Sequence, residues 1–513
     1  MPLPSIPLPP SRPPRAIRAA SVALALVLAA CGAGAGPLRA QSPPARIPAA
    51  ELLEDFAVLR DAYETLHPGL YRYADSARVA ASFGALREEL SRDRTLAEAY
   101  LAISVFLAGV RCGHSYANFF NQPEAVAHAL LQRDRVPFLF RWIGGRMVVT
   151  RNLSGEPRLA PGTEVRSING VPAADVLRRL MSVARADGSN DAKRVAGMEL
   201  RGDSRYEAFD VFFPLLFPPP DGPWSFEVAG PAGSPAATVR VRPLAYAERL
   251  AATGRAAAAR PADDPGWEFR FLDAGTGYLR MPTWSLYNSR WDWKAYLDGV
   301  FARLEERGAA ALVIDLRGNE GGTGVGDEIL ARLAARDLRL DAFRRRVRYR
   351  AVPERLRPHL DTWDRSFLDW GGQAVPGEGG FYTLTRYNDE PGSSVVRAAA
   401  RPFRGRAFVL VDASNSSATF EFALSARQNR LATLVGQPTG GNQRGINGGA
   451  FFFLRLPRSG IEVDVPLIGY FPPVERPDSG IAPDVLVEPS AEDVARGVDT
   501  ELRAVLEMIR GSR

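Results

Sequence analysis

The sequence predicts a mixed α/β protein of several domains, with a largely parallel sheet in its C-terminal half. The chain has 513 residues, more than one hydrophobic core usually holds. Apolar residues recur at helical spacing in the segment 48–130, which predicts a helical domain. Alternating strands and glycine turns in 136–245 predict a β-rich domain. From 267 to 513 buried strands alternate with amphipathic helices, a rhythm typical of α/β folds.

The first forty residues have the composition of an export signal. Three arginines between positions 12 and 18 precede an apolar run at 19–30, which is too short to span a membrane as a mature helix. The run ends in a sequence that resembles a bacterial lipobox, so cleavage before Cys31 would leave a thiol for a lipid anchor. Ordinary cleavage after Ala40 is the alternative. Either route predicts a protein of the periplasm or cell envelope.

Cysteine and histidine are too scarce for several common kinds of site. The chain has 2 Cys and 4 His, and with Cys31 in the signal, Cys112 has no disulfide partner and no cysteine-rich zinc site can form. The absence of a His-Glu-x-x-His pattern argues against a zinc peptidase. The net charge of +6 comes from arginines spread along the chain, so nucleic-acid binding is not predicted. We expect no metal or nucleotide cofactor.

Two features interrupt the domains. In the β-rich domain, a strand that ends at Asn169-Gly170 and leads into a helix resembles the middle of a PDZ domain. The polar stretch 183–207 is an unusually long insertion for that fold. In the C-terminal domain, the segment 337–402 is rich in arginine and proline, and we expect a flap or loop over one end of the sheet.

Two turns between a buried strand and a helix are candidates for chemistry, because active sites of open α/β sheets form at this edge. The first turn, 315–324, is rich in glycine and exposes backbone N–H groups that suit an oxyanion. The second, 412–417, places serines at the start of a helix predicted over 418–427. Taken alone, the glycines predict a structural turn, and Ser417 is more simply a helix N-cap.

The order of the motifs changes this interpretation. Three motifs, in this order, together resemble the tail-specific (C-terminal processing) serine protease family. They are Asp-Leu-Arg-Gly-Asn-x-Gly-Gly from Asp315, Ser-Ala-x-x-x-Phe-Ala from Ser417 and Val-Gly-Gln-Pro-Thr-Gly-Gly from Val435. Gly-Ile-Ala-Pro-Asp from Gly480 resembles its closing motif. Two upstream motifs resemble the helical domain of the family's tricorn-like branch. They are Leu-His-Pro-Gly-Leu-Tyr from Leu66 and Gly-Val-Arg-Cys-Gly-His-Ser, which ends at Ser115.

The resemblance implies a crotonase-like, Clp-protease-like α/β core and a PDZ-like domain at 136–245 that delivers chain ends or unfolded segments. Its substrates are then peptides or unfolded proteins. By register, Ser417 is the nucleophile. The oxyanion donors are the N–H groups of Ala418 and of Gly321 or Gly322.

The choice of general base depends on the absence of a lysine from the catalytic segments. One branch of the family uses a lysine at the position of Asn442, and neither Lys193 nor Lys294 lies in the catalytic segments, so the usual Ser/Lys dyad is excluded. The tricorn-like branch uses a histidine, which matches His114. A neutral imidazole is a competent base near pH 7.

The same branch orients its histidine with a second serine and a carboxylate. Ser115 matches the serine, and Glu475 or Asp478 lies nearest the carboxylate position. His67, in a His-Pro turn, is predicted to be structural.

Two alternatives to a peptidase follow from the sequence. The missing lysine, and Phe420 in place of the family's acidic residue, are consistent with an inactive homologue that binds peptides. An esterase or amidase built on the same core is the other alternative.

Overall fold

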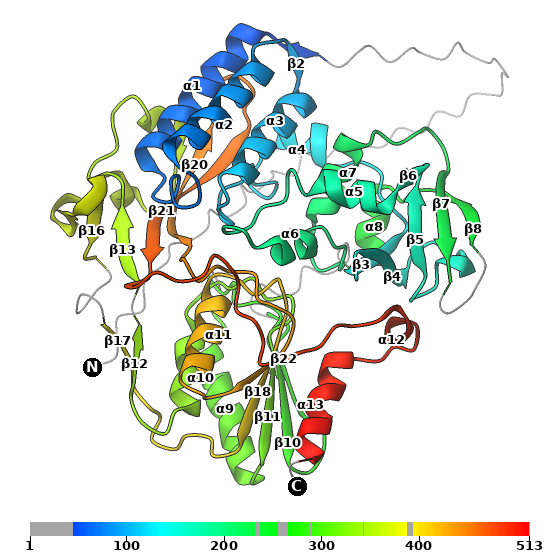
Figure 1. Ribbon diagram of the computed structural model, residues 1–513, viewed down its shortest axis with the longest axis vertical. Helices are drawn as coiled ribbons and strands as arrows, with labels where there is room; N and C mark the ends of the chain where they lie inside the picture. The colour runs from blue at the N-terminus through cyan, green and yellow to red at the C-terminus, as the bar shows by residue number, and fades with distance from the viewer. Residues whose placement is uncertain are drawn as a thin grey trace, which may run out of the picture.

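The computed structural model describes residues 45–230, 236–254, 265–287, 289–341, 343–386 and 393–511. The predicted export signal, with Cys31 and Ala40, lies outside these residues. Figure 1 shows a helical part, a β-rich part beside it and an α/β part below both. In the described part of the chain, no helix is long and apolar enough to cross a membrane.

The helical part packs its buried faces together and against a sheet built from residues far along the chain (Figure 1). A helix begins after Thr95. The Thr95 hydroxyl accepts the N–H of Glu98, and the Glu98 carboxylate accepts the N–H of Thr95, which completes a capping box. The elements are β1 (Arg46–Ile47), α1 (Ala49–Leu66), α2 (Ser76–Leu90), β2 (Arg94–Thr95), α3 (Leu96–Gly109) and α4 (Glu124–Leu131).

The middle part is an antiparallel sheet of order β3-β4-β5-β7-β8, with helices beside it. A hairpin at Gly144-Gly145, one of the glycine turns expected in 136–245, joins β3 to β4, and both glycines have the positive φ that such a turn requires. Its elements are β3 (Phe138–Ile143), β4 (Arg146–Asn152), β5 (Glu164–Ile168), β6 (Val171–Pro172), α5 (Ala173–Leu180), α6 (Asp191–Gly197), α7 (Ala208–Leu216), β7 (Trp224–Ala229), β8 (Ala237–Val241) and α8 (Tyr246–Ala252).

A buried charge cluster supports the helices of the middle part. The Asp210 carboxylate on α7 lies 3.4 Å from the Arg135 guanidinium and 3.8 Å from that of Arg249 on α8. All three side chains are at most 2% exposed. Removing one member of such a cluster leaves an uncompensated buried charge, which destabilises strongly.

We therefore expect Asp210→Asn to lower the free energy of unfolding of the middle part by about 3–5 kcal/mol, because two buried guanidinium groups lose their counter-charge. Urea unfolding, with hydrogen exchange in β3–β8 as the local reporter, measures the loss. Asp221→Asn, at an exposed position of the same part, is the matched control. Equal stability of the two variants would contradict the prediction.

The α/β part contains the predicted parallel sheet. Strands β10, β11, β18, β19 and β22 run parallel, and β9 pairs antiparallel at the edge. The mixed α/β class and its βαβ rhythm are confirmed. The elements are β9 (Glu268–Phe271), β10 (Thr276–Arg280), α9 (Trp293–Glu306), β11 (Ala311–Asp315), α10 (Val325–Leu333), β18 (Arg406–Val411), α11 (Ala418–Gln428), β19 (Thr433–Gly436), β22 (Val485–Leu486), α12 (Ala491–Ala495) and α13 (Thr500–Arg510).

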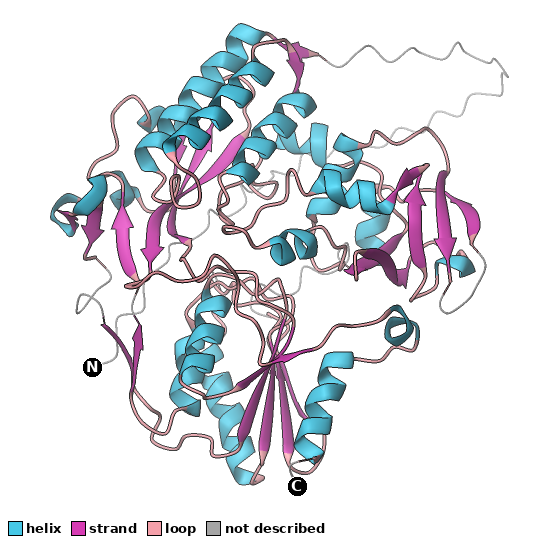
Figure 2. Cartoon of the chain, viewed as in Figure 1, coloured by secondary structure: helices cyan, strands magenta, loops and turns pink. Residues whose placement is uncertain are grey.

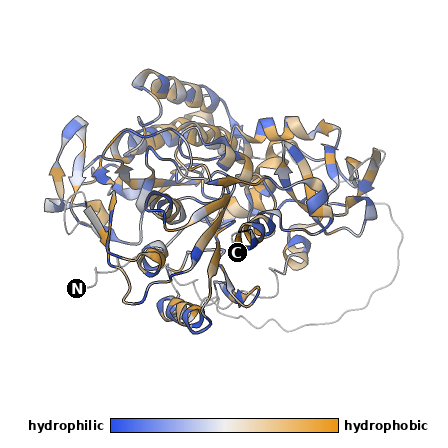
Figure 3. Ribbon diagram, turned by 60° about the horizontal axis from the view of Figure 1, so that its bottom comes forward, coloured by the Kyte–Doolittle hydropathy of each residue, from blue (hydrophilic) through white to orange (hydrophobic). Residues whose placement is uncertain are grey.

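Helices cover both faces of this sheet (Figure 2). α9, α10 and α11 share one core with the sheet, and α13 packs on the other face through Val505 and Ile509. The buried strands carry hydrophobic colour along their length, whereas the helices show both kinds of residue (Figure 3). Because β11 and β18 are adjacent and parallel, the turns that follow them meet at one edge.

The segment predicted as a flap differs from the prediction. Four short strands of 337–402 (β13, β14, β15 and β16) instead join a second sheet of order β14-β20-β21-β13-β16-β15, which packs on the helical part. Two others, β12 and β17, pair in a separate two-stranded sheet. The prediction failed because the long strands that complete this sheet come some fifty residues later in the chain. The elements are β12 (Leu338–Asp341), β13 (Arg344–Val347), β14 (Leu360–Asp361), β15 (Ala374–Pro376), β16 (Tyr382–Leu384), β17 (Ser393–Val396), β20 (Asn447–Arg455) and β21 (Glu462–Phe471).

Candidate active site

Ser417 occupies a strained turn between β18 and α11. Its backbone has φ 53° and ψ −129°, a conformation that a residue with a side chain adopts at a cost of about 1–3 kcal/mol. Its side chain makes no capping hydrogen bond within the described part of the chain. The helix-cap interpretation is therefore wrong. A strained serine at the mouth of a helix is typical of a nucleophile turn.

The turn that holds Ser417 is bonded directly to the glycine-rich turn after β11. Asn415 Nδ2 donates to the carbonyls of Leu316, at 2.6 Å, and Asn319, at 3.0 Å. Thr419 Oγ1 donates to the same Asn319 carbonyl at 3.0 Å. Asn319 in turn donates its side chain to the carbonyl of Met281 at 2.8 Å. These buried bonds fix the two turns relative to each other.

Gly321 brings the two turns into contact. A Cβ at this position would lie 2.7 Å from the Ser416 carbonyl oxygen and 2.9 Å from the Ala418 nitrogen. Its φ of 98° also favours glycine. The Gly321 N–H donates to Asn319 Oδ1 at 2.9 Å. Of the two predicted glycine donors, Gly322 is therefore the better placed to pair with Ala418.

We expect Gly321→Ala to abolish activity, because the added methyl group would press on the Ala418 amide and strain the backbone. Loss of one oxyanion donor lowers kcat by about 100- to 1,000-fold, and we expect at least this effect. Steady-state hydrolysis of fluorescein-labelled casein measures it. Gly324→Ala, in the same turn but with open space at its Cβ, is the control. Equal activities would contradict the proposed contact.

His114 presents a neutral imidazole from the helical part. Burial lowers the pKa of the ring from its usual 6.5; the Asp187 carboxylate opposes this shift and the Arg185 guanidinium adds to it. The ring packs 5.8 Å from that of Phe451. Its Nδ1 is buried and has no hydrogen-bond partner among the described residues. The histidine therefore has the protonation state of a base, but no group orients it through Nδ1.

Ser115 belongs to a separate buried pair. Its Oγ lies 2.9 Å from His67 Nε2. His67 Nδ1 accepts the N–H of Gly69, so Nε2 carries the proton and donates to Ser115. Burial lowers the pKa of His67 to about 3, and its ring stacks on that of Tyr63. The interactions of His67 are those of a structural residue, and Ser115 is engaged with it.

The two predicted carboxylates are in different surroundings. Glu475 is 89% exposed and lies 3.7 Å from Arg444, so it is unsuited to orient a buried ring. Asp478 accepts hydrogen bonds from the N–H and hydroxyl of Ser189, both at 2.9 Å, and from Asn442 at 2.7 Å. Asp478 therefore connects the site to the insertion 183–207, and His114 Nδ1 reaches neither carboxylate.

That insertion supplies site residues that the sequence analysis missed. Asp187 accepts the N–H of Gly113, next to His114, at 2.9 Å. Arg201 pairs with Asp412 at 2.9 Å. Lys193, placed outside the catalytic segments by sequence, reaches the carbonyl of Ser414 at 3.1 Å. The sequence around Lys193 gives no sign of a role in the site, apart from the rarity of lysine in this chain.

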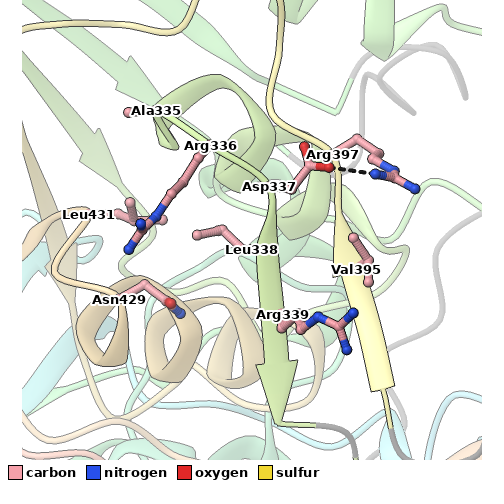
Figure 4. A pocket seen from close by; sticks show the side chains of 9 residues that line it. All are labelled: Ala335, Arg336, Asp337, Leu338, Arg339, Val395, Arg397, Asn429 and Leu431. Carbon is pink, nitrogen blue, oxygen red and sulfur yellow. Dashed lines mark hydrogen bonds and ion pairs between the residues drawn. The ribbon is translucent and has the colours of Figure 1, made fainter.

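A hollow of about 250 Å³ lies where the insertion, the helical part and the two turns meet. Its lining includes the aromatic residues Tyr116, Phe119 and Phe120, together with Glu320 and Ser414 from the two turns. A second hollow, of about 690 Å³, lies between β12, β17 and the end of α11 (Figure 4). Its arginine-rich lining contains no residue of the two turns. The first hollow is therefore the candidate substrate subsite.

Comparison with known proteins agrees with this geometry. Residues 275–487 match the profile of peptidase family S41. The chain is similar in structure to mature CPAF complexed with lactacystin, at 15% identity over 90% of this chain and 97% of that one, with a TM-score of 0.60. It is also similar to mature CPAF, at 16% identity over 87% of this chain and 94% of that one, with a TM-score of 0.56. The cpaf s499a mutant matches at 15% identity over 87% of this chain and 94% of that one, with a TM-score of 0.57. Comparison with curated protein sequences gives no match.

The fold and the family domain define a serine-type peptidase with a Clp-protease-like core and additional domains. Residues 275–487 carry a domain of peptidase family S41, which supports the predicted resemblance to tail-specific proteases.

Proposed function

We propose that this protein is an exported peptidase that cleaves peptide bonds through an acyl-enzyme on Ser417. The observation that carries the proposal is the strained, uncapped Ser417 held against Gly321. A serine that served only as a helix cap would have neither the strain nor the close glycine. The same two features disfavour the inactive homologue, because a binding surface does not require a strained serine.

In the proposed reaction, Ser417 Oγ attacks the peptide carbonyl carbon while His114 accepts the hydroxyl proton. The tetrahedral oxyanion receives hydrogen bonds from the N–H groups of Ala418 and Gly322. The carbon–nitrogen bond then breaks, and the proton on His114 passes to the leaving amine. Water hydrolyses the resulting ester and restores the serine.

His114 is the proposed base because the conventional lysine position is filled by Asn442, whose side chain donates to the Asp187 carbonyl and the Asp478 carboxylate. Among the described residues the Nδ1 of His114 has no hydrogen-bond partner, so we propose that substrate binding or a small shift of the helical part completes its orientation. Apo geometry of this kind does not disqualify a base.

The proposed substrates are peptides or unfolded proteins. The aromatic wall of the 250 Å³ hollow suits an apolar side chain, and Glu320 at its edge precedes the two glycines of the oxyanion turn. Export, with or without a lipid on Cys31, rests on the sequence of residues 1–40 alone. Mass spectrometry of the mature N-terminus separates lipidation at Cys31 from cleavage after Ala40.

We expect Ser417→Ala to abolish both hydrolysis of fluorescein-casein and labelling by a fluorophosphonate probe, because both require the nucleophile. Gel fluorescence and release of labelled peptides measure the two activities. Ser425→Ala, further along α11 and outside both turns, is the matched control and retains labelling.

Each of the other outcomes is informative. Labelling of the wild type without casein hydrolysis, but with turnover of small esters, would favour the esterase alternative. Absence of labelling in the wild type would favour the inactive homologue. Equal labelling of wild type and Ser417→Ala would contradict the nucleophile assignment.

We expect the acid limb of the kcat/KM profile to have its midpoint below pH 6.5. A base acts in its neutral form, and burial lowers the pKa of His114, so activity rises with pH through a value below the ordinary one. Hydrolysis rates from pH 4 to pH 8 measure the limb. A limb centred at or above pH 6.5, or one that persists in His114→Gln, would contradict the assignment.

A further inference from the structure

Lys193 reaches both turns of the active site from a different part of the chain. It lies on α6, in the insertion of the middle part, and its side chain is 6% exposed. Its Nζ lies 2.5 Å from Glu320 Oε1 and donates to the Ser414 carbonyl at 3.1 Å. Its methylene stem packs on Gly440, where a Cβ would lie 2.8 Å from the Lys193 Cδ.

The two contacts of Lys193 fall on the two turns that carry the predicted oxyanion donors. Glu320 immediately precedes Gly321 and Gly322, and its own carbonyl accepts the Ser416 hydroxyl at 3.3 Å. Holding the Glu320 side chain therefore restrains the peptide that leads into the glycine pair. Ser414 lies in the turn that presents Ser417. One ammonium group thus restrains both backbone segments that carry the oxyanion donors.

We propose that Lys193 is a positioning residue for the oxyanion hole, which acts by fixing the glycine-rich turn against the nucleophile turn. The inference rests on the proposed function of Ser417 and adds to it a residue that the resemblance to tail-specific proteases does not supply. Lys193 touches no reacting atom in this mechanism.

Lys193 is not suited to act as the base itself. Both of its bonds run to acceptors, the Glu320 carboxylate and the Ser414 carbonyl, so its hydrogens point at the two turns. Burial alone would raise the pKa of Glu320, but the Lys193 and Arg185 charges outweigh burial and lower it to about 2. The Glu320 carboxylate is therefore ionised near neutral pH and remains an acceptor for Lys193.

Neighbouring bonds fix the insertion around Lys193. Asn190 Nδ2 donates to the carbonyls of Thr439, at 2.8 Å, and Gly441, at 2.7 Å. Arg201 bonds to the Asp412 carboxylate, which also accepts the N–H of Gly318 at 3.2 Å. With the segment anchored at both ends, loss of the Lys193 ammonium would release the Glu320 side chain without undocking the insertion.

The test compares Lys193→Met with Lys294→Met in the purified full chain. The chain has only these two lysines, and Lys294 pairs with Glu328 at the surface, 51% exposed. We expect Lys193→Met to lower kcat for fluorescein-casein by about 10- to 100-fold, less than direct loss of a donor, with KM within about twofold. Phosphonylation by the fluorophosphonate probe should slow in parallel, and Lys294→Met should match the wild type.

Two further variants keep the test decisive. Lys193→Arg retains the charge and should recover most of the wild-type kcat. Glu320→Gln removes the carboxylate partner of Lys193 and should lower kcat, so it tests the same contact even if Lys193→Met does not fold. Wild-type kcat in both Lys193→Met and Glu320→Gln would overturn the inference. If Ser417→Ala is inactive in that case, only the role of Lys193 fails. If Ser417→Ala keeps its activity, the proposed function fails.

Discussion

The hydrogen bonds from Asn415 to the carbonyls of Leu316 and Asn319 are the constraint on which the site depends. β11 and β18 bring two turns to the same edge of the sheet, but strand pairing alone leaves the turns free to move. The Asn415 side chain is fully buried, so its bonds are not exchanged for bonds to water. They join the turn that carries the nucleophile to the turn that carries the glycines.

This junction also explains why a strained conformation persists at Ser417. A positive φ at a serine is unfavourable in isolation, and the surrounding structure must fix it. Thr419 and Asn415 bond on either side of it, and Gly321 packs against its Cβ at the spacing that only glycine permits. Violations of local preference of this kind concentrate at functional sites, because the rest of the fold supplies the stability.

Three parts of the chain contribute to the site. The α/β part supplies Ser417 and the amides proposed to hold the oxyanion, the helical part supplies His114 as the proposed base, and the insertion of the middle part supplies Asp187 and Lys193. The cations of the insertion are paired locally, since Lys193 and Arg185 both lie against Glu320, and Arg201 lies against Asp412. Near the imidazole the insertion places Asp187 and Arg185, whose charges shift the pKa of His114 in opposite directions.

The sequence by itself determined the α/β class, the parallel strands and the position of Ser417, because periodicity and motif order are local properties of the chain. It also located the strand that leads to Asn169-Gly170 and the helix that follows. Tertiary structure alone decided that β13 joins β20 and β21 in a second sheet, since that pairing spans more than a hundred residues. It also brought Lys193 to Glu320 across 127 positions, a contact between opposite charges that neither local segment encodes.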